Sequence, residues 1–207
     1  MTTEAAPLVY IVDDDQAVRD SLGMLMKSVG LASATFESAV DFLQSYDAKK
    51  HSCLVADIRM PEMSGLELQE ALLQQQATIP VVFITGHGDV PMAVNAMKAG
   101  AADFLQKPFR DQDLLDKIYR ALQSDKASRV SRLEAEETRK RIDTLTPREK
   151  EVMRMVVDGK ANKIIAFDLG VSQRTVELHR ARVMRKMGAR SLAALVSLVG
   201  KLEEKPG

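Results

Sequence analysis

The residues CLVAD, at positions 53–57, give the first indication of the fold, because four apolar residues run directly into an acid. A short apolar run that is bounded by turn residues is typical of a buried strand, and Ile-Arg-Met-Pro follows here at 58–61. A carboxylate at the end of such a strand is partly removed from water, which costs free energy unless a partner offsets it. The sequence therefore predicts that Asp57 has a special role and a compensating charge nearby.

Apolar runs and helical patterns alternate on both sides of this strand. We predict strands at residues 8–12, 31–36, 53–56, 81–84 and 103–105, and helices at residues 17–28, 38–44, 65–75, 90–99 and from about residue 112. Five strands that alternate with five helices indicate a parallel sheet with both faces covered. In an open sheet of this kind, ligands bind outside the carboxyl ends of the strands.

Chemically active residues stand at four of these strand ends. They are Asp13, Asp14 and Asp15 after the first strand, Asp57 after the third, Thr85 after the fourth and Lys107 after the fifth. Carboxylates that are gathered in one crevice repel one another, and a hard divalent cation such as Mg²⁺ relieves this repulsion. Carboxylates also attack phosphoryl groups, whose oxygens a metal and a fixed lysine neutralise. Asp57, alone on the middle strand, is the best candidate nucleophile.

Composition and charge divide the chain into two parts. Its 207 residues suit two domains, and its 45% hydrophobic content suits folded cores. Residues 1–124 carry a net charge of −7 and residues 125–207 one of +7, which favours different partners, with nucleic acid a candidate for the second half. The single Cys53 lies in an apolar run, so we expect a buried thiol and a reducing compartment. With no membrane-spanning run or signal peptide in view, we expect a cytoplasmic protein.

The spaced motifs of the acidic half resemble the receiver domain of bacterial two-component response regulators. The motifs are DDD at 13–15, Asp57 with MP at 60–61, Thr85 and KPF at 107–109, and the resemblance covers roughly residues 6–122. It implies a doubly wound (βα)5 fold and phosphoryl transfer from a sensor histidine kinase to Asp57.

The same resemblance implies the roles of individual residues. Asp14, the side chain of Asp57 and the backbone carbonyl of Arg59 would hold Mg²⁺, with Asp13 supporting it through water. Thr85 and Lys107 would contact the phosphoryl group. Thr85 and Phe104 would form the switch, and Lys107–Pro108 would be a cis peptide.

Two interpretations from other protein classes compete with this one. Asp13 and Asp15 fit the D-x-D motif of haloacid-dehalogenase phosphatases, although Ala17 stands where that family usually has Thr or Val, and Asp15 also fits the cap of a helix. Alternatively, the protein is an interaction adaptor whose basic half does not meet DNA. His87, a single loop histidine, is expected to be solvated.

The segment between the halves contains no Pro or Gly from Asp111 to Arg141 and is highly charged from Ser124 onward. It is either a flexible tether or a continuous helix that extends the fifth helix of the receiver. We expect a receiver at residues 1–123, a charged helical linker at 124–142 and a second domain at 143–207.

The basic half contains the pattern of a helix-turn-helix. TPRE at 146–149 is a capping box with Pro at the first helical position. LGVS at 169–172 forms the turn, and a helix at 173–187 follows with its apolar residues at core-facing spacing. Residues 174–190 carry a net charge of +5, which suits contacts with DNA phosphates and bases.

The motifs LTPRE, NKIIAFDLGVS, RTVELHR and KM resemble the four-helix LuxR/NarL-type DNA-binding domain, over about residues 142–204. The whole chain is most similar to the FixJ subgroup. The resemblance implies a recognition helix at 173–187, with base contacts from Arg174, Thr175, Glu177 and Arg180, and phosphate contacts from Arg182, Lys186 and Lys163. Ala161 departs from the Ser or Thr that the family often has there, so Asn162 caps the next helix or the cap is weaker.

Together these observations predict a transcriptional regulator that binds promoter DNA when Asp57 is phosphorylated. It is not an enzyme, beyond catalysing its own phosphoryl transfer and dephosphorylation. The resemblance implies a homodimer through the fourth-helix and fifth-strand face, residues 90–98 and 102–104. RNA polymerase is a further candidate partner.

Overall fold

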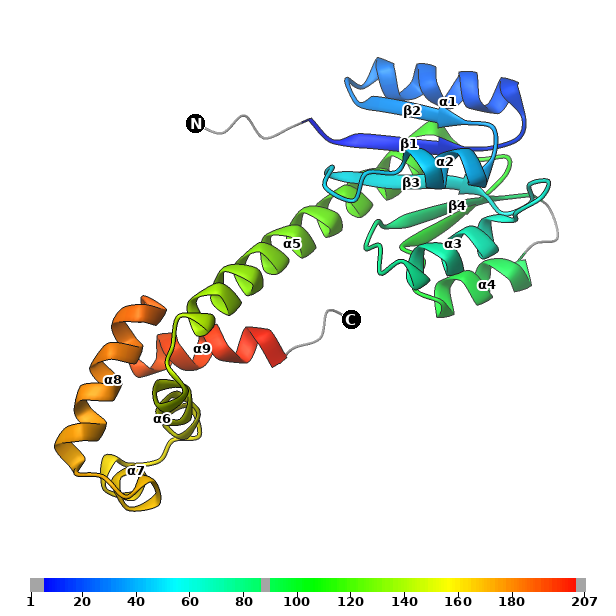
Figure 1. Ribbon diagram of the computed structural model, residues 1–207. Coiled ribbons are helices and arrows are strands. Elements are labelled where there is room, and N and C mark those ends of the chain that lie inside the picture. The colour runs from blue at the N-terminus through cyan, green and yellow to red at the C-terminus, as the bar shows by residue number, and fades with distance from the viewer. Residues whose placement is uncertain (1–5, 87–89, 204–207) are drawn as a thin grey trace. The chain divides into compact units, whose positions relative to one another are not determined.

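The computed structural model describes residues 6–86 and 90–203 (Figure 1). The chain divides into two compact units, residues 1–129 and 130–207, and each is described by itself. None of the helices in the described parts is long and apolar enough to cross a membrane.

The first unit contains a five-stranded parallel sheet with the strand order β2-β1-β3-β4-β5. Its strands are β1 (Leu8–Val12), β2 (Ala32–Phe36), β3 (Ser52–Asp57), β4 (Val81–Thr85) and β5 (Asp103–Gln106). Its helices are α1 (Gln16–Ser28), α2 (Ala39–Ser45), α3 (Gly65–Gln74), α4 (Val90–Lys98) and the first part of α5 (Asp111–Asp143). The predicted doubly wound fold is confirmed, with the strand and helix ends within one residue of the predicted ones.

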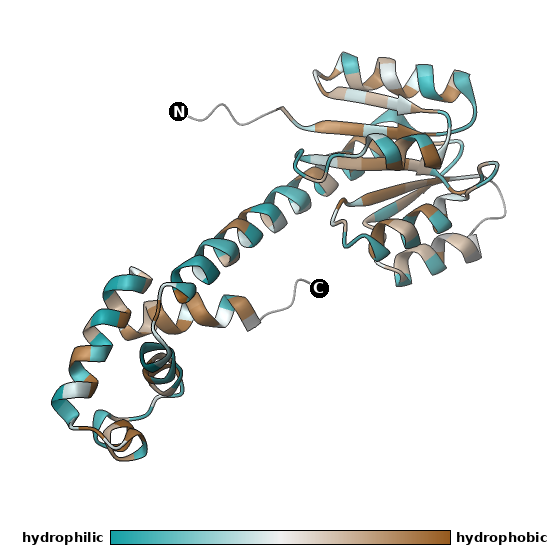
Figure 2. Cartoon of the chain, in the orientation of Figure 1, coloured by the Kyte–Doolittle hydropathy of each residue, from teal (hydrophilic) through white to brown (hydrophobic). Residues whose placement is uncertain are grey.

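The three central strands, β1, β3 and β4, are buried on both faces, which explains why they are continuous apolar runs, whereas the edge strand β2 is largely exposed. Alternate residues of β1 and β3 point to opposite faces, so that Val9 and Val55 lie in one core and Tyr10 and Leu54 in the other. Helices α1 and α5 cover the first core, and α2, α3 and α4 cover the second. In Figure 2 the central strands are coloured mainly as hydrophobic.

Cys53 belongs to the first of these cores, as the sequence predicts. Its side chain is fully buried and its thiol is free. Burial, together with the negative charge of Asp125, raises the pKa of the thiol to about 12. The thiol is therefore protonated at neutral pH, and it packs as a small apolar side chain.

The linker segment, residues 124–142, lies entirely within helix α5. Asp125, which is 3% exposed, accepts a hydrogen bond from the backbone N–H of Ser52 at 3.1 Å. Arg129 donates to Asp125 at 2.9 Å and to the backbone carbonyls of residues 48, 49 and 50. The beginning of the segment is thus fastened to the loop before β3, which favours a helix over a flexible tether.

The second unit consists of the last part of α5 and four helices, α6 (Pro147–Val157), α7 (Asn162–Leu169), α8 (Gln173–Met187) and α9 (Leu192–Glu203). Thr146 and Glu149 form the predicted capping box of α6, and Ser172 caps α8. Ala161 makes no side-chain cap, so that α7 has the weaker start that the sequence left open. Gly170 and Gly188 end α7 and α8 in the left-handed conformation, which suits glycine. The unit is closed by a core that includes Val152, Ile165, Val176, Val183, Met187 and Leu195.

Candidate functional site

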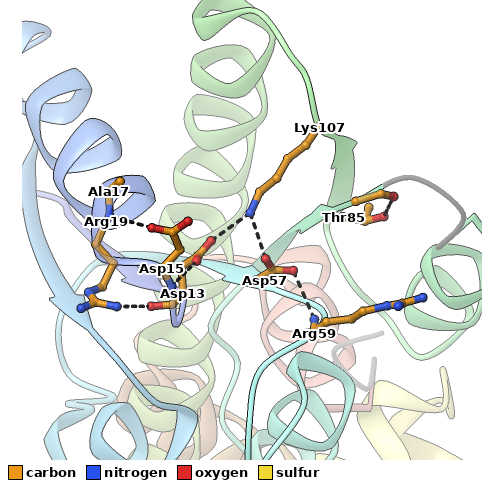
Figure 3. Close-up of polar contacts among 9 residues, drawn as sticks. Asp13, Asp15, Ala17, Arg19, Asp57, Arg59, Thr85 and Lys107 are labelled. Atoms are coloured by element: carbon orange, nitrogen blue, oxygen red, sulfur yellow. Dashed lines mark hydrogen bonds and ion pairs between the residues drawn. The ribbon is translucent and has the colours of Figure 1, made fainter.

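The carboxyl ends of the strands bring three acids together in the first unit, and Figure 3 shows two of them, Asp13 and Asp57, with Lys107. Asp13 and Asp14 follow β1 and Asp57 ends β3, two strands that pair with Val12 opposite Ala56. Asp13, Asp14 and Asp57 each offer a carboxylate oxygen, and these oxygens all lie within 4.8 Å of one another. Oxygen ligands at this spacing suit a hard divalent cation.

The loop after β5 adds a cation to this cluster. The Lys107 ammonium lies 2.9 Å from Asp57 Oδ2 and 3.1 Å from Asp13 Oδ2, and it offsets the repulsion between the two carboxylates. The backbone N–H of Lys107 donates to the Thr85 carbonyl at 2.7 Å, which ties the loop to β4. The Lys107–Pro108 peptide is cis, as the sequence resemblance implies.

The pKa values of these groups reflect burial and pairing. Burial raises the pKa of Asp13, and the hydrogen bonds from Asp15 and Lys107 oppose this only in part. Burial alone would lower the pKa of Lys107, but hydrogen bonds to Asp57 and Asp13 and their negative charges outweigh it and raise that pKa. The site therefore holds a charged ammonium beside a carboxylate that needs positive charge to stay ionised.

Asp57 is held by contacts on both of its oxygens and on its main chain. Oδ1 accepts a hydrogen bond from the Arg59 N–H at 3.1 Å, and Oδ2 accepts the one from Lys107. Helix α3 begins directly against the Asp57 carbonyl, because Gly65 has no side chain. A Cβ at Gly65 would lie 2.3 Å from that oxygen and 2.9 Å from the ring of Phe83. The sequence does not predict this role of Gly65, because Ser64-Gly65 indicates only the start of a helix.

Thr85 is the last residue of β4, and Phe104 lies in β5. The hydroxyl of Thr85 donates to the Gly86 carbonyl at 3.0 Å, and the residue is 2% exposed. Phe104 is partly buried, lies opposite Phe83 in the sheet register, and packs against the core under α3 and α4. Asp15 caps α1 by accepting from the Ala17 N–H at 2.8 Å, as the sequence suggests, while His87 lies outside the described residues.

In the second unit, helix α8 turns three apolar residues to the core and exposes most of its charged ones. Val176, Val183 and Met187 face the core as predicted. The DNA-contact candidates Arg174, Glu177, Arg182 and Lys163 are exposed, and Thr175 and Arg180 are half-buried. Thr175 shares a hydrogen bond with Ser172 at 2.8 Å, and Arg180 donates to the Asn162 side chain at 2.7 Å, which joins α7 to α8.

Lys186 has partners within the domain that the sequence does not reveal. Its ammonium lies 2.6 Å from Oε2 of Glu149, and Glu149 is only 3% exposed. The same ammonium donates to the Thr144 carbonyl at 2.9 Å. The hydrogen bond from Lys186, with that from the Thr146 N–H, lowers the pKa of Glu149 to about 2. Lys186 therefore fastens the end of α8 to α6 inside the domain.

Comparison with known proteins identifies both units. Residues 9–119 match the response regulator receiver domain family, and residues 143–199 match the luxR family of bacterial regulatory proteins. Nodulation protein W of Bradyrhizobium diazoefficiens is 46% identical over 95% of this chain and 87% of its own length. The transcriptional regulatory protein FixJ of Rhizobium meliloti is 47% identical over 92% of this chain and 93% of its own.

Solved structures agree with these matches. A low-resolution structure of the response regulator StyR shares 47% identity and a TM-score of 0.82, over 95% of this chain and 100% of that one. Full-length FixJ from B. japonicum shares 41% identity and a TM-score of 0.59, over 96% and 98%. These matches extend over both units. The chain therefore belongs to the two-component response regulators, and within them to the FixJ-like transcriptional regulators that join a receiver domain to a LuxR-type DNA-binding domain.

Proposed function

We propose that Asp57 is the phosphoacceptor of this regulator and that a sensor histidine kinase supplies the phosphoryl group. The observation that carries the proposal is the placement of the Asp57 carboxylate between Lys107 and two further acids at the end of the central strand. One Asp57 carboxylate oxygen would attack phosphorus while the P–N bond of a phosphohistidine breaks and its electron pair stays on the imidazole. Lys107, now paired with Asp57, would then neutralise a phosphoryl oxygen.

The donor set at this site fits Mg²⁺. The cation prefers few carboxylates, keeps several waters and often binds together with phosphate. We assign its direct ligands to the side chains of Asp14 and Asp57 and the backbone carbonyl of Arg59, with Asp13 bound through water. When bound, the ion supplies positive charge to the phosphoryl oxygens. The exposed position of Asp14 and the buried one of Asp13 agree with this division of roles.

Activation would reorient Thr85 toward the new phosphoryl group and move Phe104 inward, which changes the face formed by α4 and β5. Two residues one turn apart on α4, Val94 and Met97, are 44% and 39% exposed, and they offer apolar area for a second copy of the chain. A ligand or modification shifts such an equilibrium between pre-existing states, so we expect some dimer without phosphorylation.

A dimer would present two copies of α8 to a repeated DNA half-site. We assign base contacts to Arg174, Thr175, Glu177 and Arg180, and phosphate contacts to Arg182 and Lys163. Promoter DNA in the cytoplasm is the proposed target, with RNA polymerase a candidate partner there. Lys186 is left out of this set because of its pairing with Glu149.

The test is the mass of the full chain in solution by light scattering, with Mg²⁺, and with or without beryllofluoride as a phosphoryl mimic. We expect the wild type to become dimeric with the mimic, Asp57→Asn to keep the largely monomeric state of the untreated chain, and the exposed control Asp116→Asn to behave as the wild type. A wild type that gains promoter affinity while it stays monomeric would refute dimerisation. Full activation of Asp57→Asn would refute Asp57 as the acceptor.

A further inference from the structure

Arg19, on the second turn of α1, is a buried arginine beside the acidic site. It is 7% exposed, although a guanidinium is costly to remove from water unless its N–H groups are bonded. Its nearest carboxylate partner, Glu37, lies 3.9 Å away and is itself 77% exposed, so this ion pair contributes little. The burial of Arg19 must therefore be explained by its other contacts.

Those contacts are made to the segment that carries the acids (Figure 3). One terminal nitrogen of Arg19 donates to the backbone carbonyl of Asp13 at 2.7 Å, and the other donates to the side chain of Gln16. The planar fork of the guanidinium thus links the end of β1 to the first turn of α1. Asp13 itself donates its N–H to the Phe36 carbonyl at 3.3 Å, so both of its backbone polar groups are bonded.

The bond to the Asp13 carbonyl matters because of the residue that follows. A peptide unit is planar, so that fixing the carbonyl of Asp13 also fixes the N–H and the Cα of Asp14. Asp14 is exposed, and its carboxylate is one of the three that lie within 4.8 Å of one another. Arg19 therefore sets the direction in which Asp14 leaves the strand, without touching the carboxylates itself.

We propose that Arg19 is a positioning residue for the divalent cation site, acting through the peptide between Asp13 and Asp14. This inference rests on the metal site in the proposed function. The geometry of the fork, rather than the positive charge, carries the role. A positive charge near the site on its own would weaken cation binding, and its removal would strengthen it.

Two substitutions separate geometry from charge. Arg19→Lys keeps the charge but loses the fork, and Arg19→Gln loses both. Groups that orient metal ligands typically contribute about 10- to 100-fold to metal affinity, so we expect both variants to bind Mn²⁺ more weakly by about that factor. Gln16→Ala, on the exposed surface, removes the second anchor of the fork, and we expect a smaller shift in the same direction.

The measurement is Mn²⁺ binding to the full chain by electron paramagnetic resonance. Asp14→Asn should remove binding, and the exposed control Arg139→Lys should bind as the wild type does. The rate of Asp57 phosphorylation by acetyl phosphate is then measured against Mg²⁺ concentration. A positioning role shifts the half-saturating concentration for Arg19→Lys and restores the wild-type rate at saturation, whereas a merely structural role lowers thermal stability without this shift.

Three results would overturn the inference. In the first, Arg19→Lys and Gln16→Ala bind Mn²⁺ as tightly as the wild type, while Asp14→Asn does not bind Mn²⁺. The cation site would then exist, but Arg19 would not position it. In the second, Arg19→Gln binds more tightly, so charge dominates. In the third, the wild type itself fails to bind Mn²⁺, which removes the metal site of the proposed function and this inference with it. Gln16→Ala serves as the test even if both Arg19 variants fail to fold.

Discussion

Replacing Gly65 with alanine should destabilise the receiver, because it places a methyl group against the strand that carries Asp57. The new Cβ would lie 2.3 Å from the Asp57 carbonyl oxygen, 2.9 Å from the Phe83 ring and 3.1 Å from the Ile58 Cα. Carbon and carbonyl oxygen normally meet no closer than about 3.3 Å, so the start of α3 must move by about 1 Å. The nearest atom belongs to the backbone of a central strand and cannot rotate away.

The expected loss follows from these overlaps. Overpacking a filled core costs about 1–3 kcal/mol, and a clash with backbone belongs at the upper end of this range. Alanine regains up to about 1 kcal/mol through its better helix propensity. We therefore expect the free energy of unfolding to fall by about 2 kcal/mol or more. The displaced Asp57 should also be phosphorylated more slowly.

The assay is urea unfolding followed by tyrosine fluorescence. All three tyrosines, at positions 10, 46 and 119, belong to the first unit and the chain has no tryptophan, so that the signal reports on the receiver. Gly23→Ala is the matched control. A Cβ there meets nothing within 4 Å, and the helix should gain about 0.5–1 kcal/mol. Equal urea midpoints of unfolding for the Gly65→Ala chain and the wild type would refute the predicted clash at Gly65.

Three further predictions follow from the contacts described above. Because the folded-state pKa of Glu149 is lowered to about 2 from a usual 4.5, its ion pair should stabilise the second unit above about pH 4.5 and lose this effect as the pH falls toward 2. Circular dichroism should therefore show Glu149→Gln less stable than the wild type at pH 6, with the difference vanishing near pH 2. Arg182→Ala should weaken DNA binding and should reduce by about 1 the slope of log affinity against log salt concentration. Lys186→Ala should mainly lower the stability of the second unit, because it breaks the pair with Glu149. An equal loss of slope for Lys186→Ala would contradict its structural role. Burial raises the pKa of the Cys53 thiol to about 12, so this thiol should react with a thiol reagent only after unfolding. Fast labelling of the native chain would show that the core around Cys53 opens.

The acidic site could be predicted from the sequence because its members are placed by topology. Asp13 and Asp57 end adjacent parallel strands, so that the alternation of strands and helices is enough to bring them together. Local signals also sufficed for helix ends, as in the capping box of Thr146 and Glu149.

Other residues depend on contacts that sequence spacing does not reveal. Lys186 lies among the basic residues of α8, but Glu149, 37 positions earlier, determines its role. Gly65 is required by the approach of α3 to β3, and Arg19 is buried by the shape of the loop after β1. Tertiary packing determines all three, and local pattern shows none of them.

The contact between Asp125 and Ser52 has a consequence for how such regulators are assembled from parts. Ser52 begins the strand that ends with Asp57, and its buried N–H is satisfied by a carboxylate that belongs to the segment after the receiver. A chimaera joined at residue 123 would leave this donor unpaired in an apolar setting, which costs about 1–3 kcal/mol. A receiver that is exchanged between regulators should therefore carry its own residues through Arg129, so that the phosphoacceptor strand keeps its first hydrogen bond.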